Sequence, residues 1–292
     1  ESTPGSSVGT SKLKCGIVFV GAFVIEPSRI ASMIPRVSLI EIRLPVPFQP
    51  VFTRQDILLL HLIGVNVILV HGGGPDINAM LDALKIESHF ENGLRVTDKD
   101  TMDVVQMVLA GKVNKGLVAY LSALGGKAIG LSGIYGNMIQ VHTKNEKLGL
   151  VGEIDHIDTG VIDSALSAGF IPVISSVGID SKGQPHNINA DTAATKIAAA
   201  LNAECLVFMS NIDGVMKDPK DKDSLLHKLT VVETEALKKD GTINGGMIPK
   251  ADACTDAIND GVKKVFIING EVPHALLIEL LTNEGLGTMF VE

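Results

Sequence analysis

The segment His71-Gly72-Gly73-Gly74-Pro75 carries residue types whose order suits the binding of an anion. A β-branched apolar run at 65–70 predicts a strand before it, and the spacing of apolar residues over 76–85 predicts a helix after it. Consecutive glycines let backbone N–H groups turn toward a ligand, and the helix start adds a positive dipole end. We therefore expect a carboxylate or a phosphate at Gly73 and Gly74; a tight turn without a ligand is the alternative.

A second polar group, Asn187-Ile188-Asn189-Ala190-Asp191, stands directly before an alanine-rich helical stretch. Asn or Asp at a helix start is commonly a cap, which accounts for one of these residues. Two Asn and one Asp so close together exceed what capping requires. The amide of Asn187 can fix a polar substrate, and Asp191 can orient lysines or receive metal-linked contacts.

Two cationic residues follow glycine turns. Lys250 ends the segment Gly245-Gly246-Met247-Ile248-Pro249-Lys250, where a turn opens a helix and places an ammonium beside backbone donors, which suits a phosphoryl group. Arg95 follows the turn at Asn92-Gly93 and can clamp a carboxylate with two parallel hydrogen bonds. The alternatives are a solvent-exposed lysine and a surface ion pair.

Several enzyme classes that use glycine-rich loops lack their other motifs here. The oxyanion loop of α/β-hydrolases also reads HGGG, but those enzymes need a Gly-x-Ser-x-Gly elbow, and Gly130-Leu131-Ser132-Gly133 has the wrong spacing. The sequence contains neither a Walker A motif nor a Gly-x-Gly-x-x-Gly fingerprint. P-loop NTPases and ordinary dinucleotide enzymes are therefore disfavoured.

Helical and strand patterns alternate from about residue 56 onward. Helices are expected at 98–124, 161–168, 190–201, 251–260 and 275–281, and strands at 127–131, 170–175, 206–209, 264–268 and 288–291. Shorter alternation over 136–155 predicts two or three antiparallel strands that form a flap over one edge, and a loop of mixed charge spans 217–224. Strands separated by helices predict an α/β fold, with a mostly parallel sheet covered by helices on both faces.

The first 55 residues differ from the rest. Prolines interrupt any long element there, and the only element suggested is a strand at 17–24. The Ser/Thr/Gly-rich opening, which starts with Glu1, suggests a disordered stretch or the remnant of a targeting segment. A length of 292 residues lies between one large domain and two modest ones.

Charge and cysteine usage narrow the class of partner and the compartment. The formal net charge of -8 argues against nucleic acid as the main partner, so local donors must hold any anionic ligand. Cys15, Cys205 and Cys254 form no CxxC pair, which favours a reducing compartment over a disulfide framework or a zinc site. We expect Cys205 and Cys254 to be small core residues. No apolar run reaches the length of a membrane span, so no membrane association is expected.

Eight separated motifs together resemble the N-acetylglutamate kinase branch of the amino acid kinase family. In family order they are VHGGGPDIN (70–78), NGLRVTD (92–98), MVLAGKVNK (107–115), GLSG (130–133), GEID (152–155), NINADTAA (187–194), GGMIPK (245–250) and EGLGTM (284–289). The resemblance covers about residues 56–292. Agreement across so many separated motifs is highly specific.

The resemblance implies an open αβα sandwich with one continuous, mostly parallel sheet. Residues 56–185 would form the lobe for the amino-acid substrate and residues 186–292 the nucleotide-binding lobe, after an atypical, partly disordered region at 1–55. The implied reaction is ATP-dependent phosphorylation of the side-chain carboxylate of N-acetyl-L-glutamate, with Mg²⁺ neutralising the phosphates. The product would be an acyl phosphate, as in the second step of arginine biosynthesis.

The same resemblance implies roles for individual residues. Those that would hold N-acetyl-glutamate are Gly73, Gly74, Arg95 and Asn187. Asp191 would organise the catalytic lysines, and Lys250 would stabilise the phosphoryl group in flight. The nucleotide contacts would come from Ser210, Asn211, Gly214, Gly246 and Met247, and Asn211 stands where the family usually has Asp.

The C-terminal segment resembles the arginine-binding signature of feedback-inhibited, ring-shaped hexamers of the family. The matching residues are His274, Glu284 and Gly287. The resemblance therefore implies arginine as a feedback inhibitor and a homo-hexamer. The expected compartment is the cytoplasm, with a plastid as the alternative.

One family motif is missing. The first strand of the family normally ends in Lys-x-Gly-Gly, yet no lysine occurs between Lys14 and Lys85. Lys14 precedes an apolar run instead of ending one, and Arg36 and Arg43 lack the paired glycines. Three interpretations stay open: an altered sequence before residue 56, a kinase that uses Arg, or a catalytically impaired homologue that binds arginine as a regulatory subunit. A related amino acid kinase with another carboxylate substrate is a further alternative.

Overall fold

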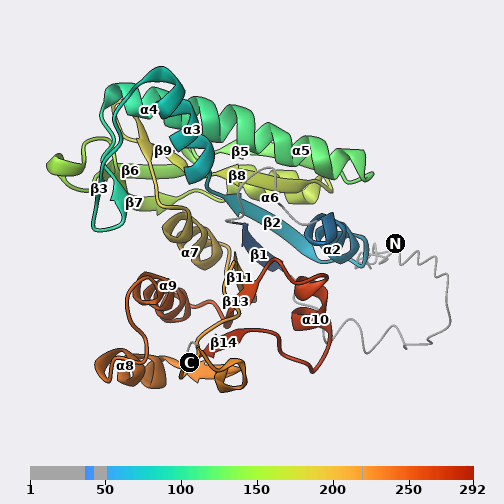
Figure 1. Cartoon of the computed structure of the whole chain (residues 1–292). Helices are drawn as coiled ribbons and strands as arrows, with labels where there is room; N and C mark the ends of the chain where they lie inside the picture. Colours follow the sequence, from blue (N-terminus) through green and yellow to red (C-terminus); the bar gives the residue numbers. More distant parts are fainter. Residues whose placement is uncertain (1–36, 43–50, 219) are drawn as a thin grey trace, which may run out of the picture. The chain divides into compact units, whose positions relative to one another are not determined.

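The computed structural model describes residues 37–42, 51–218 and 220–292, which belong to one compact unit (Figure 1). Its main sheet has eight strands in the order β12-β14-β13-β11-β1-β2-β8-β5. These strands are β1 (Val37–Ile42), β2 (Asn66–His71), β5 (Ala128–Ser132), β8 (Ile171–Ser175), β11 (Cys205–Ser210), β12 (Lys228–Thr230), β13 (Lys264–Asn269) and β14 (Thr288–Val291). All neighbours are parallel except the antiparallel pair β13–β14, which confirms the predicted mostly parallel sheet.

Helices cover both faces of this sheet. They are α2 (Val51–Leu62), α3 (Gly74–Leu84), α4 (Lys99–Gln106), α5 (Asn114–Ala123), α6 (Gly160–Ser167), α7 (Ala190–Ala200), α8 (Val231–Lys239), α9 (Met247–Asn259) and α10 (Ala275–Leu281). Helices α6, α7 and α9 supply buried residues to the core on one face, and α2 to α5 and α10 supply those on the other. Chain segments with a helical period therefore alternate with strands, as the sequence predicts.

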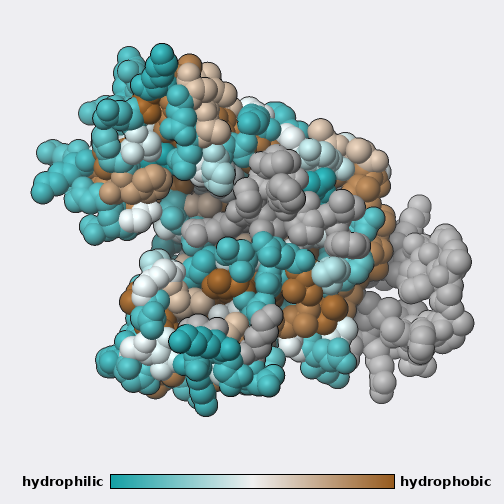
Figure 2. All heavy atoms as spheres, in the orientation of Figure 1, coloured by the Kyte–Doolittle hydropathy of each residue, from teal (hydrophilic) through white to brown (hydrophobic). Residues whose placement is uncertain are grey.

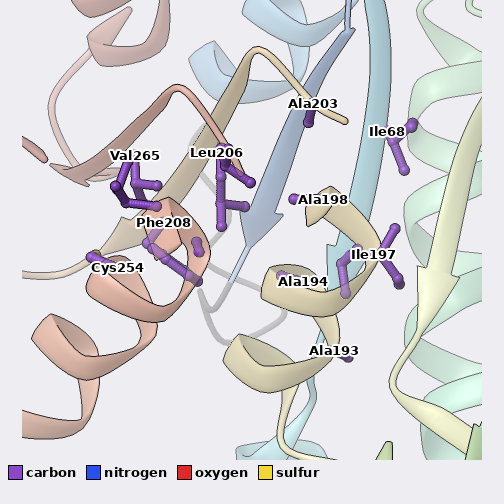
Figure 3. Packing of buried hydrophobic residues seen from close by; sticks show 14 of the residues in the cluster. Ile68, Ala193, Ala194, Ile197, Ala198, Ala203, Leu206, Phe208, Cys254 and Val265 are labelled. Carbon is purple, nitrogen blue, oxygen red and sulfur yellow. The ribbon is translucent and has the colours of Figure 1, made fainter. Parts of the chain in front are cut away.

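Each buried strand contributes to both cores because successive side chains point to opposite faces. Ile68 and Leu206 pack toward α7, whereas Val67 and Val207 pack toward the other helical layer. Figure 3 shows Ile68 and Leu206 among the small side chains of α7, which let the helix approach the sheet closely. Cys254 and Cys205 are both buried in these cores, as expected from the sequence.

Two smaller sheets lie beside the main one. β6 (Ile139–Thr143) and β7 (Gly152–Ile157) form the antiparallel pair expected over 136–155, and β9 (Val177–Ile179) and β10 (Pro185–Asn187) complete a four-stranded sheet. β3 (Phe90–Glu91) and β4 (Leu94–Arg95) form a short hairpin. The turn of this hairpin, at Asn92-Gly93, has positive φ angles at both residues, the conformation that Asn and Gly favour.

The helix expected at 98–124 is three consecutive pieces. A π-helix, Met107–Val113, separates α4 from α5. Apolar periodicity cannot distinguish this insertion, because it changes the hydrogen-bond register without interrupting the helical path. Asn114, the first residue after the π-helix, is fully buried.

Some elements were not anticipated from the sequence. β1 lies between Pro35 and Pro45, in a stretch interpreted only as interrupted by proline. Helix α8 begins with a capping box at Thr230 and Glu233, a local signal that identifies it without strong amphipathicity.

The strand expected at 17–24 and the flanking Lys14, Arg36 and Arg43 lie outside the described residues. No helix of the described part of the chain is long and apolar enough to cross a bilayer.

Candidate active site

A cavity of about 320 Å³ opens beyond the carboxyl ends of β2 and β8. All four residues expected to hold the amino-acid substrate line it: Gly73, Gly74, Arg95 and Asn187. They come from three separate parts of the chain, the β2–α3 turn, the β3–β4 hairpin and β10. Ligands of open α/β sheets bind in this position, outside the carboxyl ends of parallel strands.

The glycine turn closes one side of the cavity. A Cβ atom on Gly73 would lie 2.7 Å from Leu109 Cδ2, so a side chain at this position would force Leu109 to move. Gly74 begins α3, and Pro75 occupies the first turn, where a missing N–H costs no helical hydrogen bond. The turn therefore presents bare backbone and the positive end of a helix to the cavity.

Arg95 is buried and not part of a surface ion pair. Its side chain is 7% exposed, and Nη2 donates to Asn78 Oδ1 at 2.6 Å while Nη1 donates to Ser88 Oγ. Burial lowers the pKa of Arg95, yet a guanidinium stays charged in proteins. Because Asn78 and Ser88 are neutral, they orient the Arg95 guanidinium without cancelling its positive charge. This charge stays available for a carboxylate.

The two asparagines of the polar group serve different purposes. Asn189 caps α7, with its Oδ1 accepting from the N–H groups of Asp191 and Thr192. Asn187 lies on β10, and its Nδ2 donates to the hydroxyl of buried Thr97 at 3.1 Å. The Thr97 hydroxyl in turn donates to the Arg95 carbonyl at 2.9 Å, which links Asn187 to the backbone of Arg95.

A second cavity, of about 420 Å³, adjoins the first. It is lined by Asp191, Gly246 and Lys250 and shares Gly93, Leu94 and Asn189 with the first cavity. Figure 2 shows this face of the molecule hollowed between the part that carries β3 and the part that carries α9, with hydrophilic residues around the hollow. The predicted catalytic pair therefore lies next to the predicted substrate residues.

Lys250 lies in the first turn of α9. Its Nζ atom is buried and has no hydrogen-bond partner among the described residues. The pKa of Cys254, one turn further along α9, is raised mainly by burial; the charge of Asp191 raises it further and that of Lys250 lowers it. Both charged groups therefore lie close enough to Cys254 to act on its thiol, and both line the second cavity. A buried ammonium without a partner is costly, so the arrangement suits an anionic ligand.

A third cavity, of about 430 Å³, follows the ends of β11 and β13. It is lined by Asn211, Gly214 and Met247 of the predicted nucleotide contacts. The loop after β11 is fastened to β13, since Asn269 Nδ2 donates to Asp213 Oδ1 at 2.7 Å. Ser210 is buried at the end of β11 and does not line this cavity, and Gly246 lines the second cavity.

The three residues of the arginine signature line none of these cavities. His274 precedes α10 with φ at 58°, and its Nδ1 lies 2.7 Å from Oδ1 of buried Asp56. Burial raises the pKa of Asp56, although the His274 hydrogen bond opposes this. The amide of Gly287 donates to Glu279 Oε2 at 3.0 Å, and Glu284 is exposed in the loop between them.

His71 is a fully buried histidine at the end of β2. Burial lowers its pKa from 6.5 to about 4. The unfolded chain therefore binds this proton below pH 6.5, whereas the folded chain binds it only below about 4. Stability conferred by the neutral ring is full above 6.5 and is lost as the pH falls toward 4.

We expect the free energy of unfolding to fall by roughly 3 kcal/mol over this pH range on account of His71. Denaturant titrations at several pH values measure it, and a His71→Phe variant should lack this part of the slope. His156→Phe, which changes an exposed histidine, is the matched control and should keep the wild-type slope. An unchanged slope in His71→Phe would contradict the assignment.

Sequence reasoning missed the residues that hold the site in place. Thr97, Asn78 and Ser88 orient Arg95 and Asn187 through hydrogen bonds that only folding creates. Asp56, the partner of His274, is 218 residues away from it. Thr97 stands inside the NGLRVTD motif, so position within a motif is the one signal that could have identified it.

Comparison with known proteins agrees with the resemblance. A family profile described as "Amino acid kinase family" matches residues 53–269. Acetylglutamate kinase of Brachyspira hyodysenteriae is 50% identical over 238 residues, which are 81% of this chain and 83% of that protein. Acetylglutamate kinase of Methanocaldococcus jannaschii is 46% identical over 250 residues, with 82% of this chain and 83% of that protein covered.

Solved structures agree at the level of the fold. The crystal structure of a Streptococcus mutans UA159 protein is similar with a TM-score of 0.74 and 30% identity, over 88% of this chain and 98% of that one. The carbamate kinase of Giardia lamblia bound to AMP-PNP has a TM-score of 0.63 at 17% identity, over 88% of this chain and 98% of that one. The second similarity concerns the fold alone.

Proposed function

The chain belongs to the amino acid kinase family, and we propose that it transfers the γ-phosphoryl group of ATP to the side-chain carboxylate of N-acetyl-L-glutamate. The curated relatives cited above carry the name acetylglutamate kinase at 46–50% identity. The observation that supports the proposal most is local. One cavity gathers Gly73, Gly74, Arg95 and Asn187, and it adjoins a second cavity at Lys250, whose buried Nζ has no partner among the described residues.

The proposed chemistry needs positive charge between two anions. A carboxylate oxygen of the substrate forms a bond to the γ-phosphorus as the bond between that phosphorus and the ADP oxygen breaks. We assign Arg95, Asn187 and the glycine turn to the amino acid, and Lys250 to the phosphoryl group during transfer. Asp191 orients the Lys250 ammonium. Positioning and charge stabilisation account for most of the catalysis in such a transfer.

The nucleotide and its metal ion fit residues on the carboxyl side of β11 and β13. We assign ATP to the third cavity, with Asn211, Gly214 and Met247 as contacts and Ser210 and Gly246 nearby. No cluster of three or more acidic, His or Cys residues in the described ranges could hold a metal by itself. Mg²⁺ would therefore be held mainly by the phosphates and water, where it neutralises their charge. Residues 56–185 then serve as the substrate lobe and residues 186–292 as the nucleotide lobe.

A second candidate function rests on the absent lysine. Because no lysine occurs between Lys14 and Lys85, a catalytically impaired homologue that binds arginine as a regulatory subunit is the alternative. Loss of one transition-state cation costs on the order of a hundredfold to a thousandfold in rate, by analogy with an oxyanion donor. Turnover of ATP thus separates an enzyme from a regulatory subunit.

The test is ADP release in the presence of Mg²⁺ with N-acetyl-glutamate, glutamate, aspartate, carbamate or a nucleoside monophosphate as acceptor. We expect N-acetyl-glutamate to give the highest kcat/KM, and chelation of Mg²⁺ to stop the reaction. A higher kcat/KM with another acceptor would assign the chain to a different branch of the family. Turnover at background with every acceptor would favour the regulatory alternative.

Regulation and assembly are part of the same proposal. We assign arginine feedback inhibition to the segment of His274, Glu284 and Gly287, in a homo-hexamer within the cytoplasm. Millimolar arginine is expected to lower the rate, and Glu284→Gln to weaken this inhibition while leaving the rate without arginine unchanged. Analytical ultracentrifugation measures the oligomer. A rate that does not respond to arginine would remove this part of the proposal.

A further inference from the structure

A buried hydrogen-bond network lies directly behind the glycine turn. The Nδ2 atom of Asn114 is 2.8 Å from the Val173 carbonyl oxygen, 3.1 Å from His71 Nε2 and 3.3 Å from the Leu131 carbonyl oxygen. These acceptors belong to β8, β2 and β5, so one fully buried amide joins three strands near their carboxyl ends. No role in the proposed reaction has so far been assigned to His71 or Asn114.

The orientation of the Asn114 amide follows from its neighbours. A carbonyl oxygen only accepts hydrogen bonds, so the atom that faces Val173 must be the nitrogen. The Oδ1 atom points the other way and accepts from Lys115 Nζ at 3.0 Å. A Cβ atom on Gly130 would lie 2.0 Å from this Oδ1, so Gly130 leaves the space that the amide needs. The space that the Asn114 amide needs therefore explains the glycine at the first position of the GLSG motif.

The amide fixes the tautomer of His71. Because Asn114 Nδ2 donates to Nε2, the His71 Nε2 atom carries the lone pair and Nδ1 carries the hydrogen. Nδ1 lies 2.9 Å from the Gly72 carbonyl oxygen and therefore donates to it. The low pKa of His71, about 4, keeps the ring neutral and in this form.

Because the peptide group is planar, fixing the Gly72 carbonyl also fixes the direction of the Gly73 N–H. The Gly72 carbonyl and the Gly73 N–H belong to one trans peptide, in which the two groups point in opposite directions. With the carbonyl held by His71, the N–H of Gly73 is turned away from the core. Gly73 lines the cavity, and its N–H donates to no acceptor among the described residues.

We propose that His71 and Asn114 are positioning residues that lock the Gly72–Gly73 peptide with its N–H directed into the cavity. Glycine by itself allows this peptide to rotate, and the network selects the orientation that can stabilise an anion. This proposal rests on the proposed kinase function for its effect on rate, but the orientation itself does not depend on that function. Side chains from the π-helix, Leu109 and Val113, pack against Gly73 and close the other side of the turn.

The kinetic test compares two substitutions of His71. His71→Phe removes the donor and keeps a planar ring, whereas His71→Asn keeps an amide donor at the position of Nδ1. We expect His71→Phe to lower kcat by about tenfold to a hundredfold, with KM for ATP within about threefold of wild type, since one oriented donor is lost. His71→Asn should recover most of the loss. Wild-type kcat in His71→Phe, or equal losses in both variants, would overturn the proposal.

The tautomer is measured without any reaction by ¹⁵N NMR of the histidine rings in the full chain. We expect His71 in the Nδ1–H form in the wild-type protein and a mixture of tautomers in Asn114→Leu. A wild-type Nε2–H form would overturn the proposal even if the substituted proteins fail to fold. An Nδ1–H form in a protein without kinase activity would leave the orientation in place and reject the proposed function.

Discussion

Replacing Lys250 with methionine lowers kcat by about a hundredfold to a thousandfold, the cost of removing one preorganised donor from a developing charge. The buried Nζ atom has no hydrogen-bond partner among the described residues, so an anion that enters the cavity can supply one. An interaction made mainly with the phosphoryl group in flight changes kcat more than KM. Initial rates of ADP release over a range of both substrates measure the two constants.

Lys238 provides the matched control for this substitution. Its Nζ atom already pairs with two carboxylates, Glu235 of α8 at 2.6 Å and Asp252 of α9 at 2.5 Å. Lys238→Met removes a lysine from the same region and should leave kcat within about twofold, because such partly exposed pairs contribute little. Equal kcat values for Lys250→Met and wild type would show that the Lys250 ammonium does not stabilise the transition state.

Replacing Arg95 with alanine raises KM for N-acetyl-glutamate by about thirtyfold to a hundredfold, with little change in KM for ATP. A hydrogen-bonded interaction with a charged group contributes about 1.5–3 kcal/mol, and this is the interaction that a carboxylate facing Arg95 loses. Asn78 and Ser88 occupy only two of the five guanidinium N–H groups, so donors remain for the substrate.

The Arg95→Lys variant separates charge from geometry. A lysine keeps the positive charge but cannot reproduce the fork, so we expect a KM between those of wild type and Arg95→Ala. Isothermal titration with N-acetyl-glutamate gives the same comparison at equilibrium. A KM for N-acetyl-glutamate that is unchanged in Arg95→Ala would place the carboxylate elsewhere.

The sequence predicted the elements whose signals are local. The strand before His71 and the helix after it follow from β-branched residues, three glycines and a helical period, and the α/β fold follows from their repetition. Helical and strand patterns also predicted α10 and β14 with the bounds found in the structure. Motif residues from distant segments line neighbouring cavities, which lie beyond the carboxyl ends of the parallel strands.

What could not be predicted depends on long-range contacts. The π-helix before Asn114 has the apolar pattern of an ordinary helix, so the burial of this amide is not visible in sequence. Thr97 and Asn187 are 90 residues apart, and their hydrogen bond exists only after β10 has joined its sheet. β1 was missed because nearby prolines suggested irregular structure, although its position between β2 and β11 protects it on both edges.

The central claim, phosphoryl transfer to the side-chain carboxylate of N-acetyl-glutamate, is tested most directly by trapping the product. Incubation of the full chain with ATP, Mg²⁺, N-acetyl-glutamate and hydroxylamine converts an acyl phosphate to a hydroxamate that is detected by colour. We predict hydroxamate in stoichiometric amount with ADP, and none when N-acetyl-glutamate is omitted. ADP released without hydroxamate, or hydroxamate formed equally well from another acid, would contradict the claim.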